Sequence, residues 1–200
     1  MTQAQRVHGG APRDRRRLLN QVAALALLLE APCHGYKLYR RFVDLIGIEA
    51  APRKQSIYDV IDQLAADGLV AGEREELPSS ERQPRTTYLV TPAGRRLVAE
   101  VVEHGFSRGE TRAEFRVRLR CAGSVRDYGL LRRALEARRL KLLSQQRELP
   151  PPRSDLPTEP VVLARRLLDK QLAMELESEL EWVEWALAMV TAAEGDRAAR

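Results

Sequence analysis

Cysteine and histidine are scarce in this sequence of 200 residues, and each scarcity argues against a class of protein. Two cysteines, Cys33 and Cys121, are too few for a disulfide framework or a cysteine-based zinc site, so we expect both to be small buried residues in a reducing cytoplasm. The three histidines lack the spacing of a metal site, and we expect His34 to lie in a turn or to cap a helix. The sequence contains no phosphate-binding glycine loop and no nucleophile-elbow motif. We therefore expect no metal, no cofactor and no enzymatic activity.

Long hydrophobic runs are also absent. No window approaches the ~18 consecutive apolar residues that a transmembrane helix requires, and residues 1–17 lack the apolar centre of a secretory signal. The composition, with 44% hydrophobic and 30% charged residues, is typical of a soluble globular protein of one domain or two small ones. We therefore predict a cytoplasmic protein with no membrane partner.

The net charge of +5 is unevenly distributed along the chain. Residues 105–149 hold twelve basic and five acidic residues, whereas residues 150–200 hold six basic and ten acidic ones. Adjacent blocks of opposite charge predict two elements that pair with each other; a nucleic-acid surface is the alternative. The N-terminal arginines (Arg13, Arg15, Arg16 and Arg17) belong either to a solvated tail or to an arm that contacts phosphates.

The hydrophobic pattern predicts a mainly α-helical protein that begins with a winged helix-turn-helix. Apolar residues recur at helical spacing three times, and β-branched residues then form a two-stranded hairpin before Thr91 and Pro92 start a fourth helix. Three helices, a hairpin wing and a fourth helix, in that order, are typical of a winged helix-turn-helix. The predicted elements are helices from about residue 14 to 31, 36 to 47 and 54 to 67, strands near 69–71 and 86–90, and a helix over 92–103.

The C-terminal half predicts two long helices separated by a proline-rich loop. A basic helix covers about residues 124–149, starting at Ser124 with Asp127 three residues on, and an acidic helix covers about residues 161–192. The segment from Phe115 to Arg120 alternates like a strand but is too short to assign. Both long helices carry apolar residues beyond one stripe, so we predict an intertwined homodimer. The residues expected at this dimer interface are Leu131, Leu135, Leu172, Leu176, Leu180, Val183 and Leu187.

The predicted domains follow from these patterns. Residues 1–14 form a flexible basic arm, 15–104 the winged helix-turn-helix, 105–193 the helical dimerisation domain and 194–200 a frayed tail. Residues 18–104 of the winged part have a net charge of −2, so DNA binding there must depend on a few well-placed residues rather than on overall charge.

The winged part resembles the PadR family of bacterial transcriptional regulators. The resemblance rests on an apolar helix followed by Pro32 and His34-Gly35-Tyr36, on Ser56-Ile57-Tyr58, and on Val90-Thr91-Pro92-Ala93-Gly94. It implies a sequence-specific DNA-binding regulator in the nucleoid, a ligand-responsive repressor that acts as a homodimer on a palindromic operator. A winged-helix scaffold for protein interaction or dimerisation, without DNA binding, is the alternative.

The second helix of a helix-turn-helix lies in the major groove with its N-terminal residues leading. Its exposed residues can therefore contact double-stranded DNA: basic side chains reach phosphate or guanine, and Gln55 can bind adenine in two-point fashion. Asp59 either accepts from a cytosine amino group or is solvated or paired with Arg41. The expected DNA-binding residues are Arg53, Lys54, Gln55, Ser56 and Tyr58, with Tyr36 and Lys37 beside them and Arg82 and Arg85 in the wing.

Trp182 and Trp185 lie three residues apart on the last helix and hence on neighbouring faces. They either anchor packing or the dimer interface, or provide an aromatic platform for a small planar effector. The resemblance makes an effector plausible, because some members of the family respond to phenolic acids or planar drugs.

Overall fold

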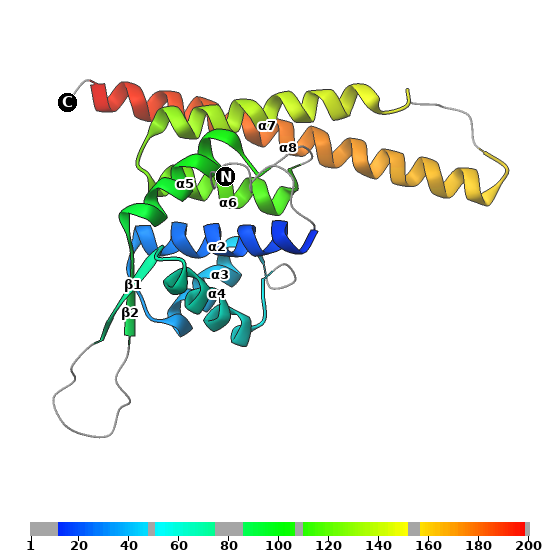
Figure 1. The fold of residues 1–200 in the computed structure, drawn as a ribbon. Helices are drawn as coiled ribbons and strands as arrows, with labels where there is room; N and C mark the ends of the chain where they lie inside the picture. The colour runs from blue at the N-terminus through cyan, green and yellow to red at the C-terminus, as the bar shows by residue number, and fades with distance from the viewer. Residues whose placement is uncertain (1–11, 48–50, 75–85, 107–109, 152–156, 199–200) are drawn as a thin grey trace. The chain divides into compact units, whose positions relative to one another are not determined.

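The protein is described by a computed structural model that covers residues 12–47, 51–74, 86–106, 110–151 and 157–198 (Figure 1). The chain divides into two compact units, Met1–Leu130 and Leu131–Arg200, which we describe separately. The predicted mainly helical fold with a small wing is confirmed. Residues 110–130, which the predicted domain limits assign to dimerisation, pack within the first unit.

The first unit is built around helix α2, whose residues 22–28 are all buried because they are apolar on every side of the helix. Helices α3, α4, α5 and α6 and strand β2 all pack against α2 (Figure 1). The elements in chain order are α2 (Pro12–Glu30), α3 (Gly35–Ile46), α4 (Lys54–Ala66), β1 (Val70–Arg74), β2 (Thr86–Val90), α5 (Pro92–His104) and α6 (Arg112–Ser124).

Local signals end α4 and begin α5 where the sequence predicts. Gly68 adopts a positive φ of 67°, and the amide of Leu69 donates to the carbonyl of Leu64 at 2.8 Å, which closes the C-terminus of α4. The Thr91 hydroxyl accepts from the amide of Gly94 at 3.2 Å and donates to the carbonyl of Gly68 at 2.7 Å. Thr91 therefore caps α5 and also ties it to the end of α4.

The wing is a two-stranded antiparallel sheet in which Val70 pairs with Val90 and Arg74 with Thr86. Its base is joined to the turn before α3, because the amide of Tyr88 donates to the carbonyl of Cys33 at 3.2 Å. The wing therefore has a fixed attachment to the helix-turn-helix.

The segment that alternates like a strand is helix α6. Thr111 and Glu114 form a capping box at its N-terminus, and the buried positions fall at helical spacing. Glu114 also pairs with Arg15 of α2; its Oε2 accepts from the Arg15 guanidinium at 2.5 Å. One of the N-terminal arginines therefore holds α2 against α6.

Acid is expected to weaken this attachment. Burial raises the pKa of Glu114, but hydrogen bonds from Arg15 and Thr111 outweigh it, so the pKa lies below its ordinary value of 4.5. A group with a lowered pKa in the folded state stabilises the fold above its unfolded pKa and loses that effect as the pH falls. At pH 7, Glu114→Gln is expected to lower the free energy of unfolding by about 1–2 kcal/mol. In urea titrations, this difference from the unaltered protein should shrink below about pH 4.5; a constant difference down to pH 3 would contradict the assignment.

Both cysteines are buried, as expected. Burial raises the pKa of the Cys121 thiol, and the charge of Glu30 raises it further. A protonated, enclosed thiol is a poor nucleophile, so Cys121 has the character of a small apolar residue.

The second unit contains most of α7 (Tyr128–Glu148) and all of α8 (Pro160–Ala198). Helix α7 starts later than predicted, because Asp127 rather than Ser124 accepts from a first-turn amide, that of Leu130, at 3.2 Å. The Ser124 hydroxyl donates instead to the carbonyl of Cys121. Helix α8 continues to Ala198, so residues 194–198 are helical, not a frayed tail.

Three ion pairs connect α7 to α8: Arg132 with Glu194, Arg138 with Glu179, and Arg139 with Glu184. This confirms that the basic block of residues 105–149 is in part neutralised by the acidic helix that follows it. The Arg138–Glu179 pair, at 2.6 Å, is largely buried, whereas Arg139 and Glu184 are exposed.

Candidate nucleic-acid interface

Helix α4 presents one apolar and one polar face. Ile57, Ile61 and Leu64 are buried against the rest of the first unit. The opposite face carries Gln55 and Asp59, both exposed. The apolar face fixes the rotation of α4 about its axis, so its polar face is held toward solvent.

The predicted DNA-binding residues of the helix-turn-helix gather at the N-terminal ends of α3 and α4. The ammonium group of Lys54 lies 4.9 Å from the centre of the Tyr36 ring, a cation–π contact that joins the two ends. Six of these residues are exposed and Ser56 is half-buried. The exposed ones are Tyr36, Lys37, Arg53, Lys54, Gln55 and Tyr58.

Gly35 has no side chain, and this leaves room for the ring of Tyr58. A Cβ atom at Gly35 would lie 2.7 Å from Cε1 of the Tyr58 ring and 3.3 Å from Cδ1 of Ile61. The Tyr58 ring therefore lies directly over the start of α3. His34, the preceding residue, caps α3 as predicted, because its Nδ1 accepts from the amide of Lys37 at 3.4 Å.

Arg41 is not a partner of Asp59. Its guanidinium donates to the carboxylate of Glu30 at 2.8 Å and to the carbonyl of Ala31 at 3.0 Å. Asp59 is exposed and forms no ion pair with any residue that the structure describes. Its carboxylate therefore stays accessible on the polar face of α4.

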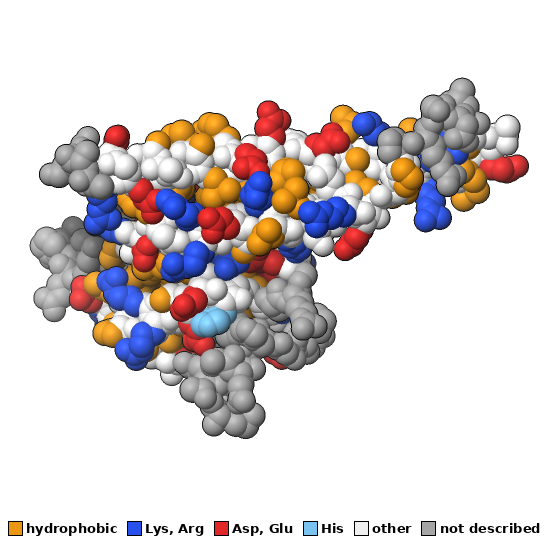
Figure 2. Space-filling view, turned by 90° about the horizontal axis from the view of Figure 1, so that it is seen from above, with side chains coloured by type: hydrophobic (Ala, Val, Ile, Leu, Met, Phe, Trp, Pro, Cys, Tyr) orange, Lys and Arg blue, Asp and Glu red, His pale blue; other side chains and the backbone are white. Residues whose placement is uncertain are grey.

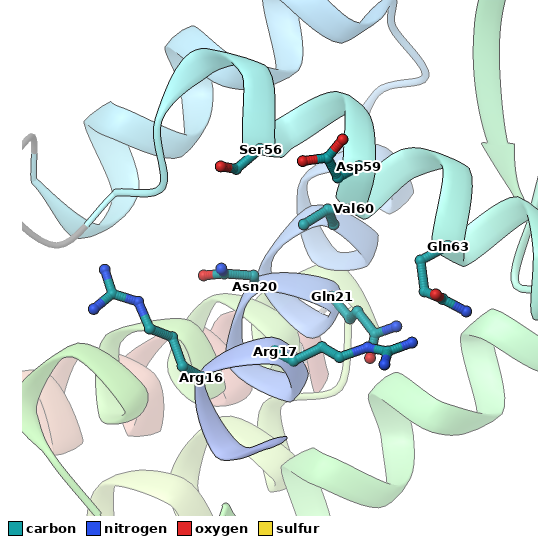
Figure 3. Close-up of a pocket in the computed structure, with 8 residues that line it drawn as sticks. All are labelled: Arg16, Arg17, Asn20, Gln21, Ser56, Asp59, Val60 and Gln63. Carbon is teal, nitrogen blue, oxygen red and sulfur yellow. The ribbon is translucent and has the colours of Figure 1, made fainter. Parts of the chain in front are cut away.

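A groove of about 640 Å³ lies between α2 and α4, and the sequence does not predict it (Figure 3). Each wall is one face of a helix, so its residues recur at helical spacing. The two helices are far apart in the sequence, so no local pattern brings the walls together. From α2 come Arg16, Arg17, Asn20 and Gln21, and from α4 come Ser56, Asp59, Val60 and Gln63.

The structure describes only part of the wing's predicted DNA-binding surface. Arg82 and Arg85, and the side chain of Arg13, lie outside the described residues. Tyr88 on β2 is half-buried; burial raises its pKa, and the charges of Asp62 and Tyr58 raise it further. Its hydroxyl therefore stays protonated at neutral pH and is available as a hydrogen-bond donor.

In the second unit, the two tryptophans of α8 are exposed, Trp182 by 41% and Trp185 by 60%. The residues predicted at the dimer interface divide into three groups by their exposure. Leu135, Leu176 and Val183 are buried in the single chain, Leu131, Leu180 and Leu187 are half-buried, and Leu172 is 46% exposed.

Neither a metal site nor a membrane-spanning helix is found in the described part of the chain. No group of three or more His, Cys, Asp and Glu residues there could hold a metal ion. None of the helices described is both long enough and apolar enough to cross a bilayer.

Three helices, a two-stranded wing and an exposed polar face on α4 define the first unit as a winged helix-turn-helix, a class of DNA-binding domain. Residues 24–100 match the family described as the transcriptional regulator PadR-like family. The match falls on the region whose sequence motifs resemble the PadR family.

Comparison with solved structures finds several similar chains. Bacillus subtilis PadR in complex with operator DNA is 17% identical, with 84% of this chain and 96% of that chain covered and a TM-score of 0.39. The same protein with p-coumaric acid is 18% identical, with 92% and 99% covered and a TM-score of 0.38. A transcriptional regulator from Thermoplasma acidophilum is 26% identical, with 42% and 75% covered and a TM-score of 0.37. No curated protein matches the chain.

Proposed function

We propose that this protein is a homodimeric repressor that reads a palindromic operator with the N-terminal end of α4 in the major groove. The observation that carries the proposal is the gathering of exposed cationic, amide and phenol groups at the start of α4, held by the buried apolar face of the same helix. An α-helix with such an end fits the width of the major groove.

The side chains at this end suit different parts of the DNA. Arg53 and Lys54 can bind phosphate oxygens or guanine, and Gln55 can bind adenine through two hydrogen bonds. Ser56 and Tyr58 have hydroxyl groups that donate to phosphate oxygens. Specific recognition therefore depends on Gln55 and its neighbours, and affinity on the cations.

A second copy of the chain is the proposed partner of the α7–α8 hairpin. After the two helices have packed together, α8 still exposes large apolar residues among its charged ones (Figure 2). Extended exposure of this kind is typical of an interaction surface. The exposed residues are Val161, Val162, Leu163, Leu167, Leu168, Leu172, Met174 and Met189, with Leu140 on α7.

The proposed repressor also responds to a small planar effector at Trp182 and Trp185. Their exposed rings, on neighbouring faces of α8, can stack on an aromatic ligand or pack in the dimer interface. Titration with p-coumaric acid as the probe separates the two roles: saturable quenching of tryptophan fluorescence supports the effector, and its absence leaves the packing role alone.

The proposed function is tested with the DNA upstream of the protein's own gene. We expect saturable gel retardation that a scrambled duplex does not reproduce, and a solution mass about twice the 22.6 kDa of one chain. The absence of retardation up to several micromolar would favour a scaffold that does not bind DNA. A monomer at micromolar concentration would contradict the dimer.

A further inference from the structure

The groove between α2 and α4 contains cationic groups that form no ion pair with the residues that the structure describes. Of the three arginines at the start of α2 whose side chains are described, Arg15 pairs with Glu114. Arg16 and Arg17 are exposed and form no ion pair within the described residues. Both lie on the wall of the groove that faces the recognition helix α4 (Figure 3).

Asn20 adds a second, independent observation. Its Oδ1 atom is buried in the structure and accepts no hydrogen bond from the described residues. The missing partner of an acceptor oxygen is a hydrogen-bond donor, which a phosphate does not supply, so Asn20 can bind phosphate only through its amide group. The carboxamide can present either its oxygen or its amide group to the groove.

The other amides of the groove are already engaged. Gln63 donates to the carboxylate of Asp67 at 3.0 Å, and Gln21 approaches the same carboxylate at 3.5 Å. This fixes the end of the groove near the C-terminus of α4. Besides the carboxylate of Asp59, which repels anions, the groups that remain for a ligand are the guanidinium groups of Arg16 and Arg17, the carboxamide of Asn20 and the hydroxyl of Ser56.

These remaining groups are suited to phosphate oxygens. Guanidinium groups bind phosphates through paired charge-assisted hydrogen bonds, and amide and hydroxyl donors complete the set. The groove is bounded by the same α4 residues, Ser56 and Asp59, that border the helix's DNA-facing surface. The groove therefore adjoins the surface of α4 that the proposed function places against DNA.

We propose that the α2–α4 groove holds the sugar-phosphate backbone of the operator, with Arg16 and Arg17 on consecutive phosphates and Asn20 and Ser56 as further donors. This inference rests on the proposed function and extends the DNA interface beyond the helix-turn-helix and wing. Phosphate contacts fix the register of a protein on the duplex but read no sequence. The groove therefore positions α4, and the bases are recognised elsewhere.

The test compares Arg16→Ala/Arg17→Ala with a control that removes the same charge, Arg116→Ala/Arg133→Ala, whose arginines are exposed on α6 and α7. Binding to the upstream duplex and to a scrambled duplex is measured by fluorescence anisotropy at several salt concentrations. The groove variant is expected to bind both duplexes roughly tenfold more weakly, with a slope of log K against log salt smaller by about two. Arg16→Lys/Arg17→Lys should keep most of the slope, and the control pair should change little.

The outcomes separate this inference from the proposed function. An unaltered protein that binds DNA, with a groove variant whose slope is unchanged, overturns the inference and leaves the function standing. Equal effects of the groove and control pairs also overturn it, because total charge then explains the loss. An unaltered protein that binds no DNA contradicts the proposed function itself. Inorganic phosphate that competes no better than chloride at equal ionic strength supports the DNA backbone, and stronger competition supports a free anion as the occupant.

Discussion

Gly94→Ala is expected to lower the free energy of unfolding of the first unit by about 3 kcal/mol, because α5 approaches the end of α4 too closely for any side chain. A Cβ atom at Gly94 would lie 2.4 Å from the carbonyl oxygen of Leu69 and 2.7 Å from Cγ1 of Val90. The Leu69 carbonyl cannot move freely, since it accepts the amide of Thr91 at 3.0 Å. The added methyl must therefore push α5 away from the base of the wing.

The control for this variant is Gly123→Ala. Gly123 lies in the last turn of α6, and a Cβ atom there meets nothing within 4 Å. Alanine is a better helix former than glycine, so this change is expected to be neutral or to stabilise by up to ~1 kcal/mol. Urea unfolding followed by circular dichroism measures both. Equal midpoints for the two variants would contradict the close approach of α5 and Leu69.

Arg138→Ala is expected to lower the free energy of unfolding by roughly 3 kcal/mol, because it removes the guanidinium group that offsets the buried negative charge of Glu179. The two side chains are only 6% and 12% exposed, and the guanidinium donates to Oε1 of Glu179 at 2.6 and 2.8 Å. A buried charge that loses its counter-charge costs far more free energy than a charge at the surface that does so.

The adjacent ion pair provides a control in the same two helices. Arg139 and Glu184 are 42% and 49% exposed, so Arg139→Ala is expected to cost less than about 1 kcal/mol. Denaturant midpoints of the two variants, measured at equal protein concentration, give the comparison. Similar losses at Arg138 and Arg139 would show that burial does not set the strength of these pairs.

Much of the winged unit could be predicted because its signals are local. Thr91 and Pro92 mark the start of α5, and Gly68 marks the end of α4, within a few residues of the helix itself. Helix α6 could not be assigned in this way. Its apolar residues alternate with arginines like those of a strand, and the Glu114–Arg15 pair that holds it in place joins residues 99 apart in sequence.

The candidate site also has a part that the sequence predicts and a part that it does not. The exposed residues at the start of α4 follow from the phase of a single helix, in which Ile57 and Ile61 must face inward. The groove cannot be predicted from the phase of a single helix. Arg16 and Ser56 belong to two different helices, and no local sequence pattern shows that these helices pack together. Asp59 illustrates the same limit. The sequence allows Arg41 as its partner, but in the fold Arg41 forms an ion pair with Glu30.

The central claim is that α4 reads the operator. The most direct test measures the affinity of the variant Lys54→Ala/Gln55→Ala for the upstream duplex and for the scrambled duplex, and takes the ratio of the two. Because Gln55 is expected to contact a base, we predict that this ratio falls by about tenfold or more, whereas Arg16→Ala/Arg17→Ala weakens both duplexes alike. The α4 variant should keep its thermal unfolding midpoint, since both side chains are exposed. An unchanged ratio in a folded α4 variant would contradict the account.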